Sequence, residues 1–425
     1  MDLKGINVLV DGYNLELIKG AGLKSYGLTL IKALNILGAN VNVLFSRRSN
    51  DDVILNEVLF FDANFDNKKE SFIKFVKLNL IKGAMKSLMR VSHKAKRVVI
   101  REMVIKMGLG ENFMDTVGIL NLEECYKIAN IVYRISGVKT KITTPKKVDI
   151  WHATYPLPIM IKRSKKITTI ADLVPLRLPY STLDDKPSYY RTIKDSISDS
   201  AIIITISEHS KKDILEIFNI RPDKIYITYP PITLRTYPTN EEKISIFLKK
   251  YDLVFHKYIL FVGAIEPRKN IGKLIDAYSM IDTDMPLIIV GKRAWLWEDE
   301  ISGRNLEGVR LLEYVSTEGL GYLYSSAYCF VFPSLYEGFG LPPLEAMTFG
   351  CPVITSKLSS LPEVCGDAAL YANPYDVYDI KEKIEDLLGN LQLRDKLSKA
   401  GQERAKLFSM ENYTKQLYEA YSKVL

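Results

Sequence analysis

The chain has 425 residues, of which 47% are hydrophobic and 25% charged, with a formal net charge of +8. This length exceeds what one hydrophobic core usually organises, so we expect at least two domains and exclude a small binding module. No uninterrupted apolar run reaches about 18 residues, which argues against a membrane-spanning helix. The N-terminus leads directly into an apolar run without a secretory signal, so the expected location is the cytoplasm.

Cysteine and histidine are too scattered in the sequence to form a metal centre. The four cysteines contain no C-x-x-C pair, and none of the four histidines lies three to five residues from another. Zinc sites need such spacings. The sequence therefore predicts buried free thiols and no metal site.

The positive charge is concentrated in residues 68–110. This segment holds twelve Lys or Arg and two Glu, so the rest of the chain is slightly acidic. Its apolar residues recur at three- and four-residue spacing, which is typical of an amphipathic helix with a cationic face. Three interpretations remain open: a helical insertion with a solvated lysine face, docking on an anionic membrane surface, and a nucleic-acid contact. No zinc finger, RNP pattern or basic heptad stretch accompanies the charge, so we expect no nucleic acid as a partner.

The first 150 residues open with a β-α-β unit. A strand is predicted at 6–10, a helix at about 25–37 and a second strand at 41–45, and Gly38 stands where the glycine after a helix end belongs. Further short apolar strands are predicted at 148–153, 167–170 and 201–207. Ser207 is the expected start of a following helix.

A second strand–helix alternation follows a proline-containing linker. Residues 229–240 hold three prolines and cannot continue a helix or a central strand. Apolar strands are then predicted at 258–263, 287–291, 309–312, 329–333, 352–355 and 369–371. The sequence thus predicts two doubly wound α/β domains, at 1–235 and 240–408. In such sheets ligands bind at the carboxyl ends of the strands.

The most informative segment covers residues 332–347, where a strand ends, a glycine loop follows and a helix begins. Glu337 and Glu345 stand eight residues apart in it. Gly338 and Gly340 let the backbone approach a ligand, and a helix N-terminus offers N–H groups to phosphate or sugar oxygens. A carboxylate accepts hydrogen bonds from two hydroxyls at once, so Glu345 is a candidate partner of a ribose.

This segment resembles the E-x7-E signature of retaining glycosyltransferases of family four. Residues 261–271 and 350–354 resemble other phrases of that family, and the match extends over most of the chain. The resemblance implies the GT-B fold, in which two Rossmann-like domains face each other across a cleft and a final helix, here 409–425, completes the first domain. It also implies a nucleotide sugar as donor, a glycan or lipid-linked acceptor, and no cofactor or metal ion.

The resemblance assigns roles to the residues at matching positions. The implied catalytic residues are Arg268 and Lys269, which neutralise the leaving diphosphate, and Glu337, which lies against the donor sugar. The implied donor-binding residues are Gly20, Gly22, Gly263, Gly338, Phe339, Gly340, Leu341 and Glu345. The acceptor-side candidates are Tyr26, His152 and Asp172. For His152, packing at the end of a strand is an equal alternative.

Two positions depart from the family pattern. Ala171 stands where relatives commonly have a histidine near the C6 oxygen of the sugar, and Ala264 stands where they often have Arg or Thr. The first departure raises the hypothesis of a 6-deoxyhexose donor. Ser25 occupies the position of the third glycine in a dinucleotide fingerprint, which argues against an NAD enzyme.

The leading hypothesis is a metal-independent, retaining hexosyltransferase of surface polysaccharide synthesis. Mannose from GDP-mannose is the first expectation for the donor, because residues 172–179 and 266–270 resemble bacterial mannosyltransferases. The alternatives are a UDP- or dTDP-sugar transferase, an epimerase or phosphorylase of the same fold, and a catalytically silent GT-B scaffold. The expected location is cytoplasmic, at the inner face of the membrane if residues 68–110 dock there.

Overall fold

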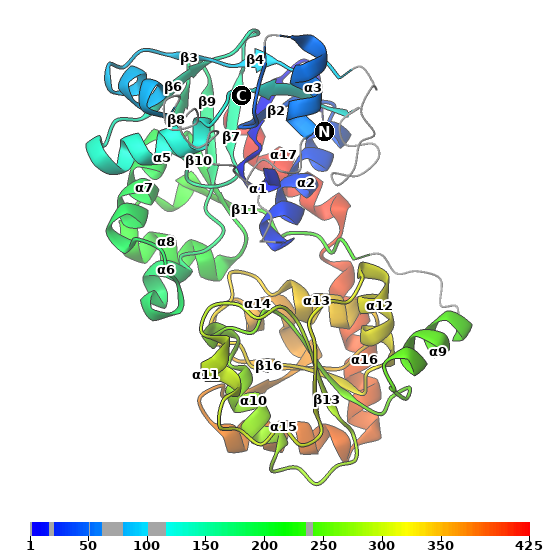
Figure 1. The fold of residues 1–425 in the computed structure, drawn as a ribbon. Coiled ribbons are helices and arrows are strands. Elements are labelled where there is room, and N and C mark those ends of the chain that lie inside the picture. The colour runs from blue at the N-terminus through cyan, green and yellow to red at the C-terminus, as the bar shows by residue number, and fades with distance from the viewer. Residues whose placement is uncertain (1, 17–20, 51, 62–79, 101–115, 235–240) are drawn as a thin grey trace.

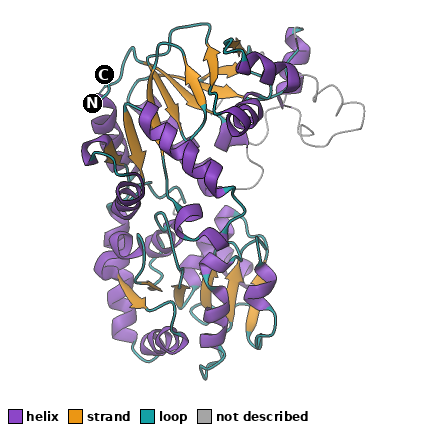
Figure 2. Ribbon diagram, turned by 90° about the vertical axis from the view of Figure 1, so that its left-hand side faces the viewer, coloured by secondary structure: helices purple, strands orange, loops and turns teal. Residues whose placement is uncertain are grey.

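The computed structural model describes residues 2–16, 21–50, 52–61, 80–100, 116–234 and 241–425. Two lobes lie one above the other (Figure 1). Each lobe contains a sheet with helices packed against it (Figure 2). Two of the predictions fall partly outside the described residues. These are the donor-binding residue Gly20 and, within the basic segment, residues 68–79 and 101–110.

The first lobe is built on a largely parallel sheet, whose described strands run in the order β11-β10-β9-β7-β1-β2-β5-β4. Their bounds are β1 (Asn7–Asp11), β2 (Asn40–Phe45), β4 (Lys96–Arg97), β5 (Gly118–Asn121), β7 (Ile150–Ala153), β9 (Lys165–Thr169), β10 (Ile202–Thr205) and β11 (Ile225–Ile227). Only the β4–β5 pair among them is antiparallel. The central strands are apolar on both sides because helices cover both faces of a parallel sheet.

The described helices of the first lobe are α1 (Tyr13–Glu16), α2 (Ala21–Ile36), α3 (Val53–Phe61), α5 (Cys125–Ser136), α6 (Val174–Arg177), α7 (Lys186–Asp199) and α8 (Glu208–Phe218). Residues 80–88 are also helical. A small sheet joins β3 (His93–Lys94), β6 (Thr140–Thr143) and β8 (Ile159–Ile161). Helix α2 begins four residues before the predicted position 25. Gly38 has a φ of +77°, and Ser207 caps α8 through its side chain, so both of these predictions are confirmed.

The second lobe is built on a parallel sheet in the order β14-β13-β12-β15-β16-β17. Its strands are β12 (Ile259–Val262), β13 (Leu287–Val290), β14 (Val309–Leu312), β15 (Cys329–Phe332), β16 (Val353–Ser356) and β17 (Ala369–Ala372). Its helices are α9 (Glu241–Lys250), α10 (Ile271–Tyr278), α11 (Trp297–Ile301), α12 (Thr317–Ser326), α13 (Leu341–Thr348), α14 (Leu361–Cys365), α15 (Val377–Leu388) and α16 (Leu391–Lys406).

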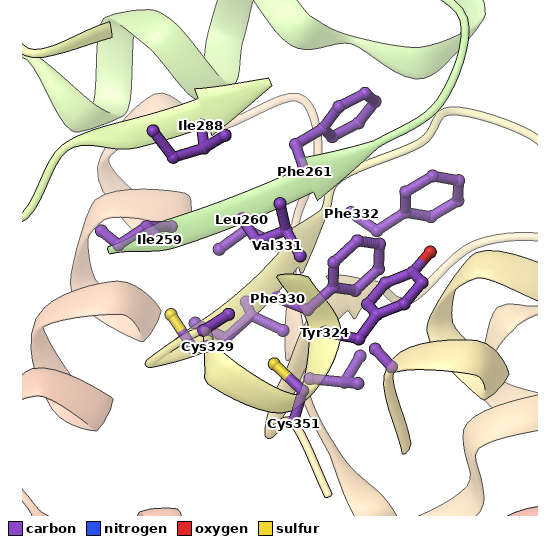
Figure 3. Close-up of a cluster of buried hydrophobic side chains, with 14 of the residues drawn as sticks. Ile259, Leu260, Phe261, Ile288, Tyr324, Cys329, Phe330, Val331, Phe332 and Cys351 are labelled. Carbon is purple, nitrogen blue, oxygen red and sulfur yellow. The ribbon is translucent and has the colours of Figure 1, made fainter. Parts of the chain in front are cut away.

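Aromatic side chains from neighbouring strands fill the core of the second lobe (Figure 3). The rings of Phe261 and Phe332 stack with centroids 5.6 Å apart. Tyr324 of α12 packs edge-on against Phe330. All four cysteines are buried and free, as expected. This packing gives the loops that follow β12 and β15 a rigid base.

The last helix, α17 (Met410–Ser422), returns to the first lobe, where it lies beside α2 (Figure 1). Its side chains Tyr413, Leu417 and Tyr421 are fully buried in the same core as β1 and β2. The chain therefore passes between the lobes twice, once between β11 and α9 and once at the start of α17. Among the described residues, no helix is long and apolar enough to cross a membrane.

Candidate active site

Two loops of the second lobe lie side by side at the carboxyl end of its sheet. Strands β12 and β15 are parallel neighbours, so the loops that follow them, 263–270 and 333–340, leave the sheet at the same edge. The loops are joined directly, because the Leu335 amide donates to the Arg268 carbonyl over 2.8 Å. Lys269 closes a short 3₁₀ turn, Pro267–Lys269, just before α10. Side chains that the sequence separates by almost 70 residues thereby meet.

A compact charge cluster is the chemical centre of these loops. The Lys269 ammonium lies 2.6 Å from one oxygen of Glu337, and the Arg268 guanidinium lies 2.9 Å from the other. The Ser334 hydroxyl donates to the same Glu337 oxygen as Lys269, over 2.5 Å. Arg268 also pairs with Glu266 at 2.7 Å. Glu337 and Lys269 are each only 7% exposed, so these charges act on one another with little screening by water.

The pKa values in this cluster follow from burial and from the opposite charges. Burial alone would raise the pKa of Glu337, but Arg268 and Lys269 outweigh it and hold that pKa at about 2. Burial lowers the pKa of Lys269, and the adjacent Glu337 partly opposes this shift. Each cation in contact with the buried carboxylate is therefore held in place before any ligand arrives.

Gly338 and Gly340 of the loop after β15 are each required for a different structural reason. An added Cβ at Gly338 would lie 2.7 Å from the Asp172 carboxylate of the first lobe. Gly340 has a φ of +118°, which favours glycine, and it directly precedes α13. The start of α13 offers fewer N–H donors to a ligand than the sequence predicts for a helix N-terminus. Two of its first three residues, Pro342 and Pro343, have no N–H group.

Glu345 lies on α13 and lines the same cavity as Arg268, Lys269 and Glu337. It accepts a hydrogen bond of 3.1 Å from the hydroxyl of Tyr324. Burial raises its pKa to about 7, although the Tyr324 hydrogen bond opposes the shift. Glu345 therefore differs from Glu337 in that no cation of the described residues holds it in its ionised form.

One cavity of about 760 Å³ between the lobes gathers nearly all the predicted site residues. The described members that line it are Gly22, Tyr26, Asp172, Gly263, Arg268, Lys269, Glu337, Gly338, Phe339, Gly340, Leu341 and Glu345. Gly20 lies outside the described residues. Gly22 belongs to the first turn of α2, not to a loop. Ala171 and Leu320 line the same cavity.

Tyr26 and Asp172 of the first lobe line this cavity opposite the second lobe. The Tyr26 hydroxyl is 2.8 Å from the Thr169 hydroxyl, and burial raises its pKa to about 12. One Asp172 oxygen accepts from the Val174 amide over 3.1 Å. Burial raises the pKa of Asp172, while the nearby Arg268 opposes the rise. The first lobe therefore contributes a neutral hydroxyl and a carboxylate opposite the charge cluster.

The prediction that His152 faces the cleft is wrong. Its side chain is completely buried in the first lobe. One ring nitrogen lies 2.6 Å from the Tyr421 hydroxyl of α17, and the other lies 2.8 Å from the Thr169 hydroxyl. Burial lowers its pKa to about 3. Both nitrogens are occupied because β7 is a central strand covered by α17, so the alternative of packing at the end of a strand is correct.

Several serines that hold the Glu337 loop were missed in the sequence. The Ser360 hydroxyl lies 2.6 Å from the Phe339 carbonyl, and the Ser359 hydroxyl accepts from the Glu337 amide over 2.9 Å. From the first lobe, the Ser207 hydroxyl donates to the Gly338 carbonyl over 2.7 Å. The signal available in the sequence was their position near the carboxyl ends of predicted strands, because Ser207 ends the strand predicted at 201–207 and Ser359 and Ser360 follow the strand predicted at 352–355 by four and five residues. In the described part of the chain, no group of three or more His, Cys, Asp or Glu is arranged to hold a metal ion.

Comparison with known proteins places this site in context. The model of the family described as Glycosyl transferases group 1 matches residues 247–404. O-antigen chain mannosyltransferase B of Escherichia coli is 38% identical over 282 residues, which cover 64% of this chain and 74% of that protein. O-antigen chain mannosyltransferase RfbU of Salmonella typhimurium is 32% identical over 267 residues, which cover 62% and 69%. The solved structure of sucrose-phosphate synthase from Thermosynechococcus elongatus aligns with a TM-score of 0.65 at 16% identity, over 98% of each chain.

The structural match extends over both lobes, and the family match contains the loops that carry Arg268, Lys269, Glu337 and Glu345. The GT-B fold expected from the sequence, with two Rossmann-like domains facing across a cleft, is therefore confirmed. The chain belongs to the glycosyl transferases group 1 family.

Proposed function

We propose that this protein transfers mannose from GDP-mannose to a glycan or lipid-linked oligosaccharide during synthesis of a surface polysaccharide. The observation that carries the proposal is the Arg268–Glu337–Lys269 cluster, set in a cavity of about 760 Å³ between two lobes. The choice of mannose is supported by relatives that are O-antigen mannosyltransferases, one of them 38% identical.

In this proposal Arg268 and Lys269 bind the diphosphate of the donor. Negative charge grows on the leaving diphosphate as the bond to the sugar breaks, and fixed cations in a partly dry cavity stabilise that charge strongly. Both cations are held by Glu337 before the donor binds, so little reorganisation is needed. These two cations supply the positive charge, and we propose that the reaction needs no metal ion.

We propose that the reaction retains the anomeric configuration. The bond between the anomeric carbon and the diphosphate oxygen breaks, and an acceptor hydroxyl forms the new bond on the same face and gives its proton to the leaving phosphate. Both oxygens of Glu337 already accept hydrogen bonds, from Lys269 and Ser334 on one side and from Arg268 on the other. This arrangement suits a residue that orients the sugar better than a nucleophile that attacks it.

Thermal shift with GDP, UDP, dTDP and ADP, each with and without magnesium, tests the donor. A ligand that binds the folded state alone raises the free energy of unfolding by about 2.7 kcal/mol at one hundred times its Kd, and the melting temperature rises with it. A shift with GDP alone, equal with and without magnesium, is the expected result. A shift with UDP or dTDP alone would favour the alternative donors, including a 6-deoxyhexose. No shift with any nucleotide would favour a silent scaffold.

Substitution of Lys269 tests its role in turnover. Lys269→Ala should lower kcat with GDP-mannose by at least about a hundredfold, as does loss of one charged group that stabilises a transition state. Lys273→Ala is the matched control, because Lys273 is on the adjacent α10 and its ammonium bonds only the Tyr375 carbonyl in the described structure, over 3.1 Å. Similar turnover in the two variants would contradict the assignment.

We also propose that the described part of the basic segment contacts an anionic membrane. Large apolar side chains with 47–67% exposure are found on the helix at 80–88 and just after it: Ile81, Met85, Leu88 and Met89. Lys82, Lys86 and Arg90 alternate with them in the sequence. An exposed apolar strip between cations is typical of a helix that lies in a membrane interface, where each cation contributes about 1 kcal/mol.

Cosedimentation with vesicles tests this contact. Wild type should bind vesicles that contain phosphatidylglycerol and should bind pure phosphatidylcholine vesicles at least about tenfold more weakly. The Met85→Ser/Met89→Ser variant should lose binding, whereas Met280→Ser, at a 44% exposed methionine of the second lobe, should keep it. Full binding by the double variant would refute the proposal.

A further inference from the structure

The N-terminal turn of α8 in the first lobe forms hydrogen bonds to the loop that carries Glu337 in the second lobe. The Ser207 hydroxyl donates to the Gly338 carbonyl over 2.7 Å, and the Ser210 hydroxyl reaches the same carbonyl at 3.3 Å. Both serines are fully buried. Ser207 also caps its own helix by accepting from the Ser210 amide over 3.0 Å. One carbonyl next to Glu337 is therefore held by two side chains of the opposite lobe.

A carboxylate of the second lobe completes this contact from the other direction. Glu363 of α14 accepts from the Glu208 amide over 2.7 Å and from the His209 amide over 3.1 Å. These amides have no partner within α8, because the first N–H groups of a helix lack intrahelical acceptors. The negative charge also lies at the positive end of the helix dipole. Glu363 thus serves as a cap that one lobe provides for a helix of the other.

A third contact reaches the residue before Glu337. The Tyr336 hydroxyl donates to Asp213 of α8, and Asp213 is held by Arg177 at 2.5 Å. Asp213 is only 2% exposed. The Tyr336 carbonyl in turn accepts from Arg268 over 2.8 Å. The residues on both sides of Glu337 are therefore bonded to the first lobe, Tyr336 through its side chain and Gly338 through its backbone.

We propose that Ser207, Ser210 and Glu363 are positioning residues, which place the Glu337 carboxylate against the donor when the two lobes are together. The inference rests on the proposed function, because it takes Glu337 to orient the donor sugar. None of the three side chains is among the residues that line the cavity. Their loss should therefore disturb the placement of Glu337 and leave the binding of the nucleotide almost unchanged.

The variants separate the positioning role from general stability. Ser210→Ala removes a donor to Gly338 and leaves the α8 cap in place, because that cap uses the Ser210 amide. Ser207→Ala removes a donor and the cap, and Ser207→Thr retains both. Glu363→Gln removes the charge. The matched control is Ser398→Ala, because the Ser398 hydroxyl also donates to a glycine carbonyl, that of Gly350, over 2.7 Å, but entirely within the second lobe.

The expected result is a fall in kcat with GDP-mannose of about tenfold in Ser207→Ala/Ser210→Ala, with the donor KM changed by less than about twofold. Ser207→Thr should restore kcat, and Ser398→Ala should match wild type. A double variant with the kcat of Ser398→Ala, or with a raised KM and normal kcat, would overturn the proposal.

The radius of gyration from small-angle scattering tests the contact between the lobes separately from the proposed function. If wild type does not turn over GDP-mannose, the proposed donor is wrong, and the contact between the lobes is then judged from the radius of gyration alone. Ser207→Ala/Glu363→Gln should have a larger radius than Ser398→Ala in the absence of nucleotide. Equal radii would show that these contacts do not join the lobes in solution and would overturn the proposal.

Discussion

Glu345 offers a test in which one side chain links stability, pH and nucleotide binding. Its carboxyl group is half-buried near Tyr324, and burial raises its pKa from 4.5 to about 7. A raised carboxyl pKa means that the folded state favours the protonated form. The folded state therefore has no penalty below pH 4.5, and it loses stability as the pH rises from there through 7.

The size of the effect follows from the shift. Each pKa unit corresponds to about 1.4 kcal/mol, so the full shift is worth about 3 kcal/mol, reduced to about 2 kcal/mol by partial exposure to water. Glu345→Gln has no carboxyl group to ionise. It should melt within about 1 °C of wild type at pH 5 and about 5 °C above it at pH 8. Glu242→Gln, at an exposed position of α9, should show no such divergence.

Calorimetric titration with GDP then tests the role of Glu345 at the ribose. Ribose hydroxyls donate more strongly to an ionised carboxylate, so nucleotide binding should lower the pKa of Glu345 and release a proton at pH 6.5. The binding enthalpy of wild type should differ between phosphate and Tris buffers, and that of Glu345→Gln should not. A stability gap that stays constant from pH 5 to 8 would refute the electrostatic reasoning. Binding without proton release would refute the ribose contact.

Two further substitutions probe the packing around the site. His152→Ala removes the hydrogen-bonding ring next to the buried Tyr421 and Thr169 hydroxyls, and unfolding should become easier by about 3 kcal/mol in a urea titration, with the donor KM unchanged. Gly338→Ala places a methyl group 2.7 Å from the Asp172 carboxylate, so kcat should fall by at least about tenfold. Gly389→Ala, whose added methyl has its nearest neighbour at 3.4 Å, is the control for the second substitution.

The sequence predicted the fold because its patterns are local. Apolar strands separated by amphipathic helices require parallel sheets, and a glycine such as Gly38 marks a helix end by its own conformation. The charged site could also be predicted from the sequence, for a similar reason. Arg268, Lys269 and Glu337 lie in the loops that follow two strands, and the rule that ligands bind at the carboxyl ends of strands brings them together once the strands are neighbours.

The remaining features depend on contacts between distant segments. His152 lies near the carboxyl end of a strand, and nothing near it in the sequence shows that Tyr421 will cover it. Ser207 looks like an ordinary helix cap, and its second bond, to Gly338, exists only because the lobes meet. Tertiary packing decides such cases, since the same local pattern is compatible with an exposed or a buried side chain.

The placement of α17 has a consequence for synthesis on the ribosome. Tyr413 and Tyr421 belong to the core of the first lobe, yet the entire second lobe is translated before them. At about 5–20 residues per second, the interval between residues 234 and 421 lasts about 10–40 s. During that time the part of the first-lobe core that packs against Tyr413 and Tyr421 lacks its partner, so this core can be completed only after the second lobe has been translated.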